Sequence, residues 1–306
     1  MNDVSKKMVV TGGAGFIGSH VADALVALGH EVHVIDSLVN GKREHVPTDA
    51  ILHELDILDT VRIAPIIEGA HTVFHLAALP RVEFSLEHPV EAHEANVNGT
   101  LSVLIAARDG KAGRVVYSAS SSAYGDQETL PLREDMPANP PHPYGLQKHI
   151  SELYMRQFSS AYGLPTVSLR YFNIYGPRLD PDGAYALVIG RFLSQRAEGK
   201  PLTITGDGTQ TRDFTHVSDA VRANLLASES ENVWNGEVIN IGAGRNTSIQ
   251  ELADIIGGDR EYIPERRETK HTRADNRLAK ELLGWAPSVG LEEGIKDLKR
   301  EWGLDL

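Results

Sequence analysis

Tyr144 and Lys148 stand four residues apart in the segment PYGLQKHISELY. At this spacing two side chains share one face of a helix, so a phenol and an ammonium group would lie side by side. A phenol with a pKa near 10 is a poor base at neutral pH, but a neighbouring cation favours the phenolate and lowers that pKa. The pair therefore predicts proton transfer to and from a hydroxyl group. Because the same spacing is common on helix surfaces, the prediction needs a second signal.

That second signal is a group of serines that precedes the pair. The run GRVVYSAS has the composition of a buried strand, and SSAYG follows it directly. Ser118, Ser120, Ser121 and Ser122 therefore crowd the predicted carboxyl end of the strand. Ligands of open α/β sheets bind at this end of the strands. We expect the serines and the Tyr–Lys pair to face one pocket.

A glycine-rich turn, TGGAGFIGSH, lies near the start of the chain. Gly12, Gly15 and Gly18 are three residues apart, and Gly13, Gly15 and Gly18 also satisfy G-x-G-x-x-G. Early glycines allow a tight turn and a close approach to a pyrophosphate, while the last one lets the helix pack on the sheet. The helix N-terminus then faces the phosphates. Because the turn follows a strand-like run and opens a helical pattern, it predicts dinucleotide binding.

Asp36 ends the next strand-like run, EVHVID, at 18 residues beyond Gly18. A carboxylate at this point can hold the ribose hydroxyls of the adenosine. It would also repel the 2′-phosphate of NADP, so it favours NAD, although Lys42 and Arg43 leave NADP open. Asp56, in LDILD, could accept a hydrogen bond from the adenine amino group or could be a turn residue. Bound oxidised nicotinamide would add a second positive charge near the phenol.

Alternating strands and helices must position these residues. Strand-like runs occupy 8–12, 31–36, 72–78, 113–120 and 166–173, and helical patterns occupy 18–28, 89–109 and 144–162. This alternation predicts an α/β fold, a doubly wound parallel sheet of the Rossmann type with helices on both faces. We expect the NAD-binding Rossmann domain to span 1–175, with segments from about 213–245 returning to it. Residues 176–306, richer in turn signals, would mainly form a smaller α/β C-terminal substrate lobe.

The composition excludes several classes of protein. The net charge of −12 over 306 residues argues against general binding to nucleic acid or to a membrane surface, but not against a small anion in a local basic pocket. The absence of cysteine removes disulfides, thiolate metal sites and cysteine nucleophiles, and fits a cytoplasmic location. The 13 histidines are scattered without H-E-x-x-H, so no metal site is predicted. We find neither a signal peptide nor a membrane-spanning stretch.

The chain resembles the extended short-chain dehydrogenase/reductase superfamily, in its nucleotide-sugar epimerase/dehydratase branch. The motifs TGGAGFIGSH, HLAA, NVNGT, SSSAYG, YGLQK, RYFNIYGP, GDGTQTRDFTHVSD and LLGW occur in the family's order, from Met8 to about Pro287. The resemblance implies a Tyr–Lys–Ser/Thr site, NAD bound in a Rossmann domain, and a nucleotide-sugar bound in the smaller lobe. It also implies a homodimer, because the helices at 89–109 and 144–162 correspond to those of the family's four-helix dimer interface.

Carried over by motif, Tyr144 would be the acid/base, and Lys148 its electrostatic partner and a contact of the nicotinamide ribose. Ser120 would bond the 4-hydroxyl of the sugar. Asn96 matches the asparagine of the family's N-x-N-G helix, a structural and cofactor-side residue. The residues expected to contact NAD are Gly12, Gly15, Phe16, Ile17, Gly18, Asp36, Asn40, Gly41, Asp56, Ile57, Leu76, Ala77, Ala78, Asn96, Ser118, Tyr144, Lys148 and Tyr171.

The resemblance also assigns a substrate-binding set. Its members are Ser120, Ser122, Tyr144, Asn173, Arg212, Arg266, Glu268 and Thr272. Asn173 and Arg212 would contact the diphosphate, which a guanidinium fork suits better than an ammonium group does. Arg212 could instead pair with Asp213 at the surface. The family's late R-x-G-[D/E] motif appears as ERRETK, without its glycine. Arg266 or Arg267 would therefore meet the diphosphate, and Glu268 would hold the nucleotide ribose.

The serines also bear on the reaction. Dehydratases of this branch carry acids where this chain has Ser121 and Ser122, and decarboxylases place a glutamate nearby. We therefore expect 4-epimerisation. Tyr144 would take the 4-hydroxyl proton while C4 gives hydride to NAD; the 4-keto sugar would rotate, and hydride would return to its other face. Thr272, three residues before Asp275, matches the position that lines the pocket for the sugar's 2-substituent. Its small side chain predicts UDP-GlcNAc/UDP-GalNAc as substrates beside UDP-Glc/UDP-Gal.

Alternatives remain open at this stage. A UDP-glucuronate or UDP-pentose 4-epimerase shares these motifs, and Arg81 near the sugar could favour a carboxylate. A dTDP- or CDP-sugar enzyme is also possible, because no residue identifies the base. A non-catalytic NAD-binding scaffold would be expected to lack the tyrosine or the lysine, and both are present.

Overall fold

A parallel sheet of seven strands forms the larger part of the computed structural model, which describes residues 5–179, 188–233, 235–265 and 269–304. Its strands are β1 (Lys7–Thr11), β2 (Glu31–Asp36), β3 (Ile51–Glu54), β4 (Thr72–His75), β5 (Val115–Ser120), β6 (Thr166–Tyr171) and β11 (Glu237–Ile241). They lie in the order β11-β6-β5-β4-β1-β2-β3, and every neighbouring pair is parallel. The connections change direction between β1 and β4, where such sheets open a ligand crevice.

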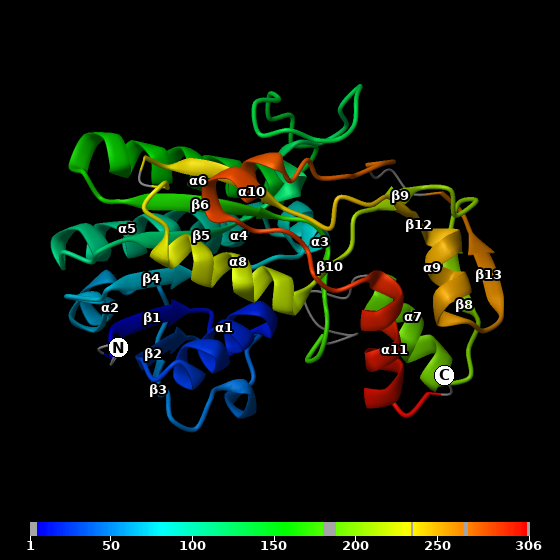
Figure 1. The fold of residues 1–306 in the computed structure, drawn as a ribbon, viewed down its shortest axis with the longest axis horizontal. Coiled ribbons are helices and arrows are strands. Elements are labelled where there is room, and N and C mark those ends of the chain that lie inside the picture. The colour runs from blue at the N-terminus through cyan, green and yellow to red at the C-terminus, as the bar shows by residue number, and fades with distance from the viewer. Residues whose placement is uncertain (1–4, 180–187, 234, 266–268, 305–306) are drawn as a thin grey trace.

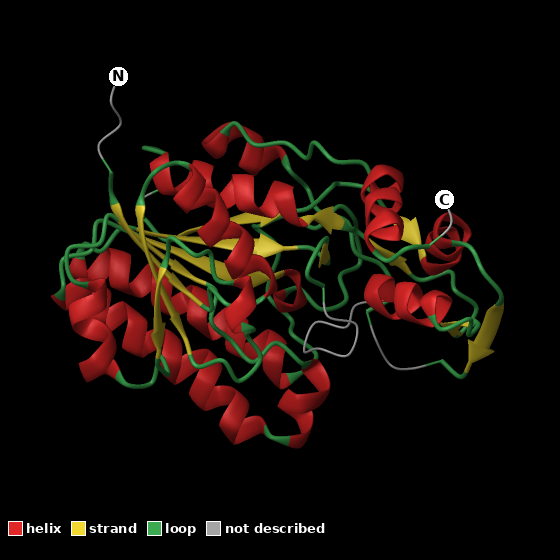
Figure 2. Ribbon diagram, turned by 90° about the horizontal axis from the view of Figure 1, so that it is seen from below, coloured by secondary structure: helices red, strands yellow, loops and turns green. Residues whose placement is uncertain are grey.

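Helices cover both faces of this sheet (Figures 1 and 2). On one face pack α1 (Phe16–Ala27), α8 (Val217–Glu229) and α10 (Arg277–Leu283). On the other pack α2 (Thr60–Ile67), α5 (Gly99–Asp109) and α6 (Pro143–Tyr162). Side chains alternate between the two cores along each strand, so that Val10 faces the first core and Val9 the second. Burial on both faces explains the unbroken apolar run Met8–Val10 of the central strand β1. The predicted Rossmann fold class is confirmed.

A smaller lobe, at the right of Figure 1, has a core of its own. It contains α7 (Val188–Ala197), β8 (Leu202–Thr205), α9 (Ile249–Ile256), β13 (Arg260–Ile263) and α11 (Leu291–Glu301). Strands β8 and β13 pair in parallel. Two short pairs lie between this lobe and the sheet: β7 (Ile174–Tyr175) with β10 (Thr215–His216), and β9 (Thr211–Arg212) with β12 (Thr247–Ser248).

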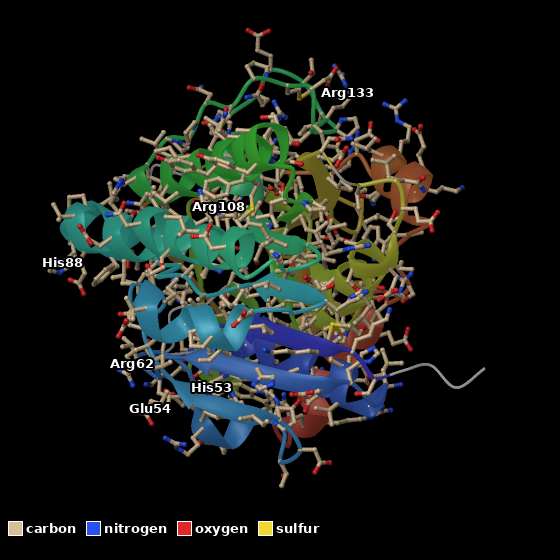
Figure 3. All side chains as sticks on the ribbon, turned by 90° about the vertical axis from the view of Figure 1, so that its left-hand side faces the viewer. His53, Glu54, Arg62, His88, Arg108 and Arg133 are labelled. Carbon is tan, nitrogen blue, oxygen red and sulfur yellow. The ribbon has the colours of Figure 1, made fainter. Side chains whose placement is uncertain are left out.

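Some elements differ from the sequence expectations. The helix expected at 89–109 is interrupted, because α4 (Pro89–His93) and α5 flank a π-helical turn at Glu94–Asn98. Strand β3 was not predicted; in Figure 3, His53 and Glu54 mark it at the sheet edge. The strand expected at 72–78 ends at His75, and that expected at 166–173 ends at Tyr171. Short helices complete the described chain: α3 (Val82–Glu87) and the 3-10 turns Arg43–His45 and Ser121–Ala123. Across the described ranges, none of the helices has the length and apolarity that crossing a membrane requires.

Candidate functional site

The glycine turn between β1 and α1 leaves no space for side chains. Gly12 has a φ of +71°, and a Cβ at this residue would lie 2.6 Å from the backbone nitrogen of Ala77. At Gly18 a Cβ would lie 2.1 Å from the carbonyl oxygen of Gly12. The turn is therefore built for close contact of its own backbone with the end of β4, and it leaves the N-terminus of α1 open toward a ligand.

A cavity of about 810 Å³ lies over the carboxyl ends of β1, β2 and β4. Its volume is within the range of small-molecule and cofactor sites. Most residues expected to contact NAD line it, namely Gly12, Gly15, Phe16, Ile17, Gly18, Asp36, Asn40, Gly41, Asp56, Ile57, Leu76, Ala77, Ala78 and Ser118. They come from five separate segments of the chain, so residues that are distant in the sequence line one cavity.

Asp36 is buried at one end of this cavity. Its Oδ2 accepts a hydrogen bond of 2.9 Å from the Ala14 N–H, and its Oδ1 accepts one of 2.8 Å from the Leu38 N–H. Burial raises the pKa of the carboxyl, and the two N–H groups oppose that shift. Asp56 is exposed, and its Oδ1 accepts the N–H of Leu58, as in a turn. Both carboxylates keep lone pairs for further donors.

Four residues of the expected cofactor set do not line this cavity, namely Asn96, Tyr144, Lys148 and Tyr171. Asn96, in the π-helical turn, accepts the N–H of Leu79 at 2.7 Å and donates to the Leu79 carbonyl and to Gln147. It thereby holds the loop after β4, where Leu79 itself lines the cavity. Tyr171 belongs to the core, and its hydroxyl accepts a hydrogen bond of 2.6 Å from Asn224. Neither side chain lines the cavity.

The Tyr–Lys pair lies in the first two turns of α6, as its spacing predicted. The helix begins at Pro143 after His142, whose ring accepts the N–H of Gly145 and so caps the first turn. The backbone N–H of Tyr144 donates to the Ser85 hydroxyl at 3.1 Å, which joins α6 to α3. Tyr144 is 6% exposed and Lys148 is 4% exposed. Both polar side chains are thus held in a nearly water-free environment.

Lys148 points at the end of β5. Its Nζ donates to the backbone oxygen of Ser118 at 2.8 Å and lies 4.9 Å from the centre of the Tyr117 ring. Burial lowers the pKa of this ammonium group to about 7, against the attraction of Glu152 one turn further along α6. The Glu152 carboxylate is itself engaged by Arg170 through two hydrogen bonds of 2.7 Å.

Ser120 and Ser122 form a hydroxyl pair where β5 ends. Ser120 caps the 3-10 turn by accepting the Ser122 N–H at 3.2 Å. The Ser122 hydroxyl also donates to the Ser120 hydroxyl at 2.8 Å. Ser120 keeps its own hydroxyl proton available for another acceptor. The turn therefore presents one polarised hydroxyl beside the start of α6.

The remaining substrate candidates meet at the junction of sheet and lobe. Asn173, at a φ of +34°, donates to the Asp213 carbonyl at 3.1 Å. Arg212 donates to the carbonyls of Thr211 and Lys270 at 3.0 and 3.2 Å. The Thr272 hydroxyl accepts the Asp213 N–H at 3.3 Å, and the residue is 9% exposed. Arg266, its alternative Arg267, and Glu268 lie outside the described residues.

The sequence reasoning did not assign three cations that line the cavity, Lys42, Arg81 and Arg178, to the cofactor. Arg178 has a φ of +64°, donates to the Ser19 hydroxyl at 2.9 Å and pairs with Asp23 at 2.7 Å, both on α1. A positive charge is thereby fixed beside the helix whose N-terminus faces the cavity. The sequence could have indicated Arg178 as a site residue, because it directly follows the motif RYFNIYGP. Among the residues that the structure describes, no group of three or more His, Asp or Glu could hold a metal ion.

Comparisons with known proteins agree with this geometry. The family model described as the NAD dependent epimerase/dehydratase family matches residues 8–242. A UDP-glucose 4-epimerase from Thermotoga maritima, solved with UDP-glucose, is 39% identical with a TM-score of 0.91 and covers 97% of this chain and 98% of its own. A UDP-N-acetylglucosamine 4-epimerase from Methanobrevibacter ruminantium, solved with UDP-N-acetylmuramic acid, is 36% identical, with a TM-score of 0.91 and coverage of 97% and 99%. A UDP-glucuronic acid 4-epimerase from Bacillus cereus, solved with UDP-glucuronic acid and NAD, is 32% identical, with a TM-score of 0.89 and the same coverage.

Proposed function

Since the chain belongs to the NAD-dependent epimerase/dehydratase family, we propose that it is an isomerase that inverts C4 of a UDP-sugar with NAD as its resident cofactor. The observation that carries this proposal is that Lys148 reaches the carboxyl end of β5, where Ser120 lies, and that Tyr144 precedes it by one turn of α6, beside the glycine-turn cavity that Ser118 lines. We name UDP-Glc/UDP-Gal and UDP-GlcNAc/UDP-GalNAc as the substrates. The two solved 4-epimerases named for UDP-glucose and UDP-N-acetylglucosamine support both pairs.

The residues that line the cavity fit NAD by their polar groups. The backbone of the glycine turn would hold the pyrophosphate at the N-terminus of α1, with Arg178 nearby to balance its charge. Asp36 would accept the adenosine ribose hydroxyls with the lone pairs that Ala14 and Leu38 leave free. When bound, NAD supplies a hydride acceptor that later returns the hydride to the substrate.

In this proposal, Tyr144 moves the proton and Lys148 makes that movement possible. The phenolate of Tyr144 would accept the proton of the 4-hydroxyl, and the same phenol would return it after C4 is inverted. The buried ammonium of Lys148 would stabilise the phenolate, because a charge acts more strongly in a medium of low dielectric constant. Ser120 would donate to the sugar's 4-oxygen, since its acceptor sites are already used by Ser122.

The 3-10 turn favours epimerisation over loss of water. Serines occupy both positions where the family's dehydratases carry acids, and Ser122 is engaged with Ser120 rather than free for another role. Serines at positions 121 and 122 cannot supply the acid/base catalysis that elimination from the oxidised C4 intermediate would need. Rotation of that intermediate requires that the nucleotide diphosphate, which Asn173 and Arg212 would hold at the junction of sheet and lobe, supply most of the binding energy.

A 4-epimerase of UDP-glucuronate is the second candidate. Arg81 lines the cavity, and a guanidinium group is well suited to a sugar carboxylate. The Bacillus cereus 4-epimerase of UDP-glucuronic acid supports this candidate, at a lower sequence identity than the first two enzymes.

The direct test is incubation of the purified protein with UDP-Glc, UDP-Gal, UDP-GlcNAc, UDP-GalNAc and UDP-glucuronate, without added cofactor. We expect C4-inverted products from the first four sugars. Turnover confined to UDP-glucuronate would favour the second candidate, and a 4-keto-6-deoxy product would replace the proposal with a dehydratase.

We also propose that the enzyme is a homodimer joined through α6 and the helices beside it. Leu146 and Leu153 lie two turns apart on α6 and are 48% and 50% exposed, and Val90 on α4 is 74% exposed. Burying such side chains against a second copy would stabilise the assembly by removing apolar surface from water. Native mass spectrometry of the purified protein would report a mass of two chains, and a single-chain mass would contradict the proposal.

A further inference from the structure

Asp213 is fully buried where four segments of the chain meet. It directly follows Arg212 of β9 and precedes β10. The four segments are the β6–β7 turn, the strand β9, the loop after β11 and the stretch before α10. Sequence reasoning considered Asp213 only as a surface partner for Arg212, and the structure gives its carboxylate other neighbours.

The carboxylate accepts hydrogen bonds from three backbone N–H groups. Oδ1 accepts from Ala243 at 2.7 Å, and Oδ2 accepts from Gly244 at 2.9 Å and from Ala274 at 2.8 Å. The first two donors belong to the loop after β11, and the third belongs to the stretch that leads to α10. Burial raises the pKa of this carboxyl to about 6, and the backbone N–H groups oppose that rise because they favour the carboxylate.

The backbone of Asp213 makes two further hydrogen bonds, each with the side chain of a substrate candidate. Its N–H donates to the Thr272 hydroxyl at 3.3 Å, and its carbonyl accepts from the Asn173 side chain at 3.1 Å. With Arg212 as its covalent neighbour, Asp213 is thus linked to three members of the substrate-binding set.

The stretch that carries Thr272 is held from its other side as well. Leu132 donates to the Arg273 carbonyl at 2.7 Å and accepts the N–H of Asp275 at 3.0 Å. The loop of Leu132 follows the hydroxyl pair at the end of β5; Arg133 marks it above the sheet in Figure 3. Residues 272–275 therefore lie between that loop and Asp213.

There is no spare room at the junction. A Cβ on Gly242 would lie 3.0 Å from the Asp213 Oδ2 and 2.4 Å from the Ala274 Cβ. Backbone and carboxylate are therefore in direct contact, with no space for a bridging water.

We propose that Asp213 is a positioning residue that sets Arg212, Thr272 and Asn173 at the right separation for a UDP-sugar. This inference rests on the proposed function, because the three residues act together only if the lobe binds such a ligand. Asp213 itself need not touch the substrate. The site requires a carboxylate rather than an amide, because an asparagine would turn its NH₂ toward at least one of three N–H donors.

The chain offers a matched control in Asp219. This carboxylate is 1% exposed and accepts the Ser288 N–H, the Ser288 hydroxyl and the Val289 N–H; it also pairs with Arg222 at 2.6 Å. It ties α8 to the stretch before α11 and contacts none of the substrate candidates through these bonds. Asp213→Asn and Asp219→Asn thus each replace a buried carboxylate that accepts several hydrogen bonds, and only Asp213 adjoins the proposed site.

The experiment measures, for both variants, KM and kcat with UDP-glucose, the Kd of UDP by calorimetry, the NAD content and Tm. We expect both variants to lower Tm. Only Asp213→Asn should raise KM and the Kd of UDP, by about 10-fold, the size expected when one buried hydrogen bond is lost. Its NAD content should stay at the wild-type value and its kcat within about threefold. Unchanged KM and Kd, or equal effects in both variants, would overturn the positioning role.

Gly242→Ala covers the case in which Asp213→Asn does not fold. The added Cβ would press on Ala274 and on the Asp213 carboxylate, and should raise KM while the carboxylate is intact. A folded Gly242→Ala enzyme with wild-type KM would also overturn the inference. If the wild type neither binds UDP nor converts UDP-glucose, the proposed function fails, and the inference fails with it. If the wild type does both, only the positioning role is at stake.

Discussion

The ammonium of Lys148 donates to the backbone carbonyl of Ser118 at 2.8 Å, across the boundary between α6 and β5. Ser118 lines the cavity and Lys148 lies behind it, so this bond fixes a positive charge at the cavity wall. Tyr144 lies one helical turn earlier on α6. The bond between Lys148 and Ser118 therefore joins α6, which carries the proposed acid/base Tyr144, to the carboxyl end of β5. Ligands of such sheets bind at this end of the strands.

Replacing Lys148 by methionine should lower the activity of the enzyme without lowering its thermal stability. Methionine has a similar length and no charge, so Lys148→Met should lower kcat by about 10²- to 10⁴-fold, the usual contribution of acid–base catalysis. Tm should stay the same or rise, because burial disfavours the charged lysine and lowers its pKa to about 7. Turnover assays and thermal melts of the same preparation test both statements. Lys280→Met, on the exposed side of α10, serves as the control and should keep wild-type activity.

The buried imidazole of His75 should make folding sensitive to mild acid. Thr100 donates its hydroxyl proton to the Asn96 carbonyl, so it accepts from His75 Nε2, and His75 Nδ1 accepts from Thr11. Burial lowers the pKa of His75 to about 3. The unfolded chain binds a proton here below about pH 6.5 and the folded chain does not. The free energy of unfolding therefore falls as the pH is lowered from about 6.5 toward 3, by at most about 1.4 kcal/mol per pH unit from this group.

Urea unfolding at several pH values between 7.5 and 5, with His75→Gln beside the wild type, measures this contribution. The glutamine variant should be less stable at pH 7.5, but its free energy of unfolding should fall less steeply with acid. Parallel slopes for the two proteins would show that His75 is not the group that binds the proton.

Gly41 should be required for cofactor retention. A Cβ at Gly41 would lie 2.8 Å from the Asp36 Oδ1 and 2.8 Å from the Ala14 Cβ, so alanine would displace the carboxylate expected to hold the adenosine ribose. We expect Gly41→Ala to be purified with less than about a tenth of the wild-type NAD content. Gly290→Ala is a matched control, because the nearest atom to its added Cβ is 4.0 Å away. The test is to release NAD from each variant by heat and to measure it by absorbance. Equal NAD contents in both variants would contradict the placement of the adenosine ribose beside Asp36 and Gly41.

Thr272→Tyr should narrow the substrate range. Thr272 is 9% exposed and accepts the Asp213 N–H, and by the family resemblance it lines the pocket for the sugar's 2-substituent, which a tyrosine ring would fill. We expect kcat/KM for UDP-GlcNAc to fall by more than about 100-fold, while that for UDP-glucose changes by less than about tenfold. Competition between the two sugars in one reaction gives the ratio directly. If the ratio did not change, the pocket for the 2-substituent would have to lie elsewhere.

Local patterns were enough to predict the glycine turn, the start of α6 and the hydroxyl group at the end of β5. Each of these depends on residues close together in the chain, since the glycines set their own turn and the Tyr–Lys spacing follows from helical periodicity. Strand β3 was missed because it is a short edge strand with two exposed and two partly buried residues, so it lacks the apolar run of its neighbours.

Other features depend on contacts between distant residues. Asn96 lies in the π-helical turn, and its amide bonds Leu79 in the loop after β4 and Gln147 on α6. The role of Asp213 depends on Ala243 and Ala274, which lie 30 and 61 residues further along. A short stretch of sequence cannot predict the contacts of Asn96 or of Asp213, because their partners are distant in the chain.

The most direct test of the proposed reaction follows the hydrogen atom at C4. The purified enzyme, with no added cofactor, is given UDP-glucose that carries deuterium at C4 in ordinary water, and the product is examined by proton NMR and mass spectrometry. The proposed reaction predicts UDP-galactose that retains the deuterium at C4, because the hydride leaves and returns within one active site. UDP-galactose that has lost the deuterium to water, or a product altered at C5 or C6, would contradict it.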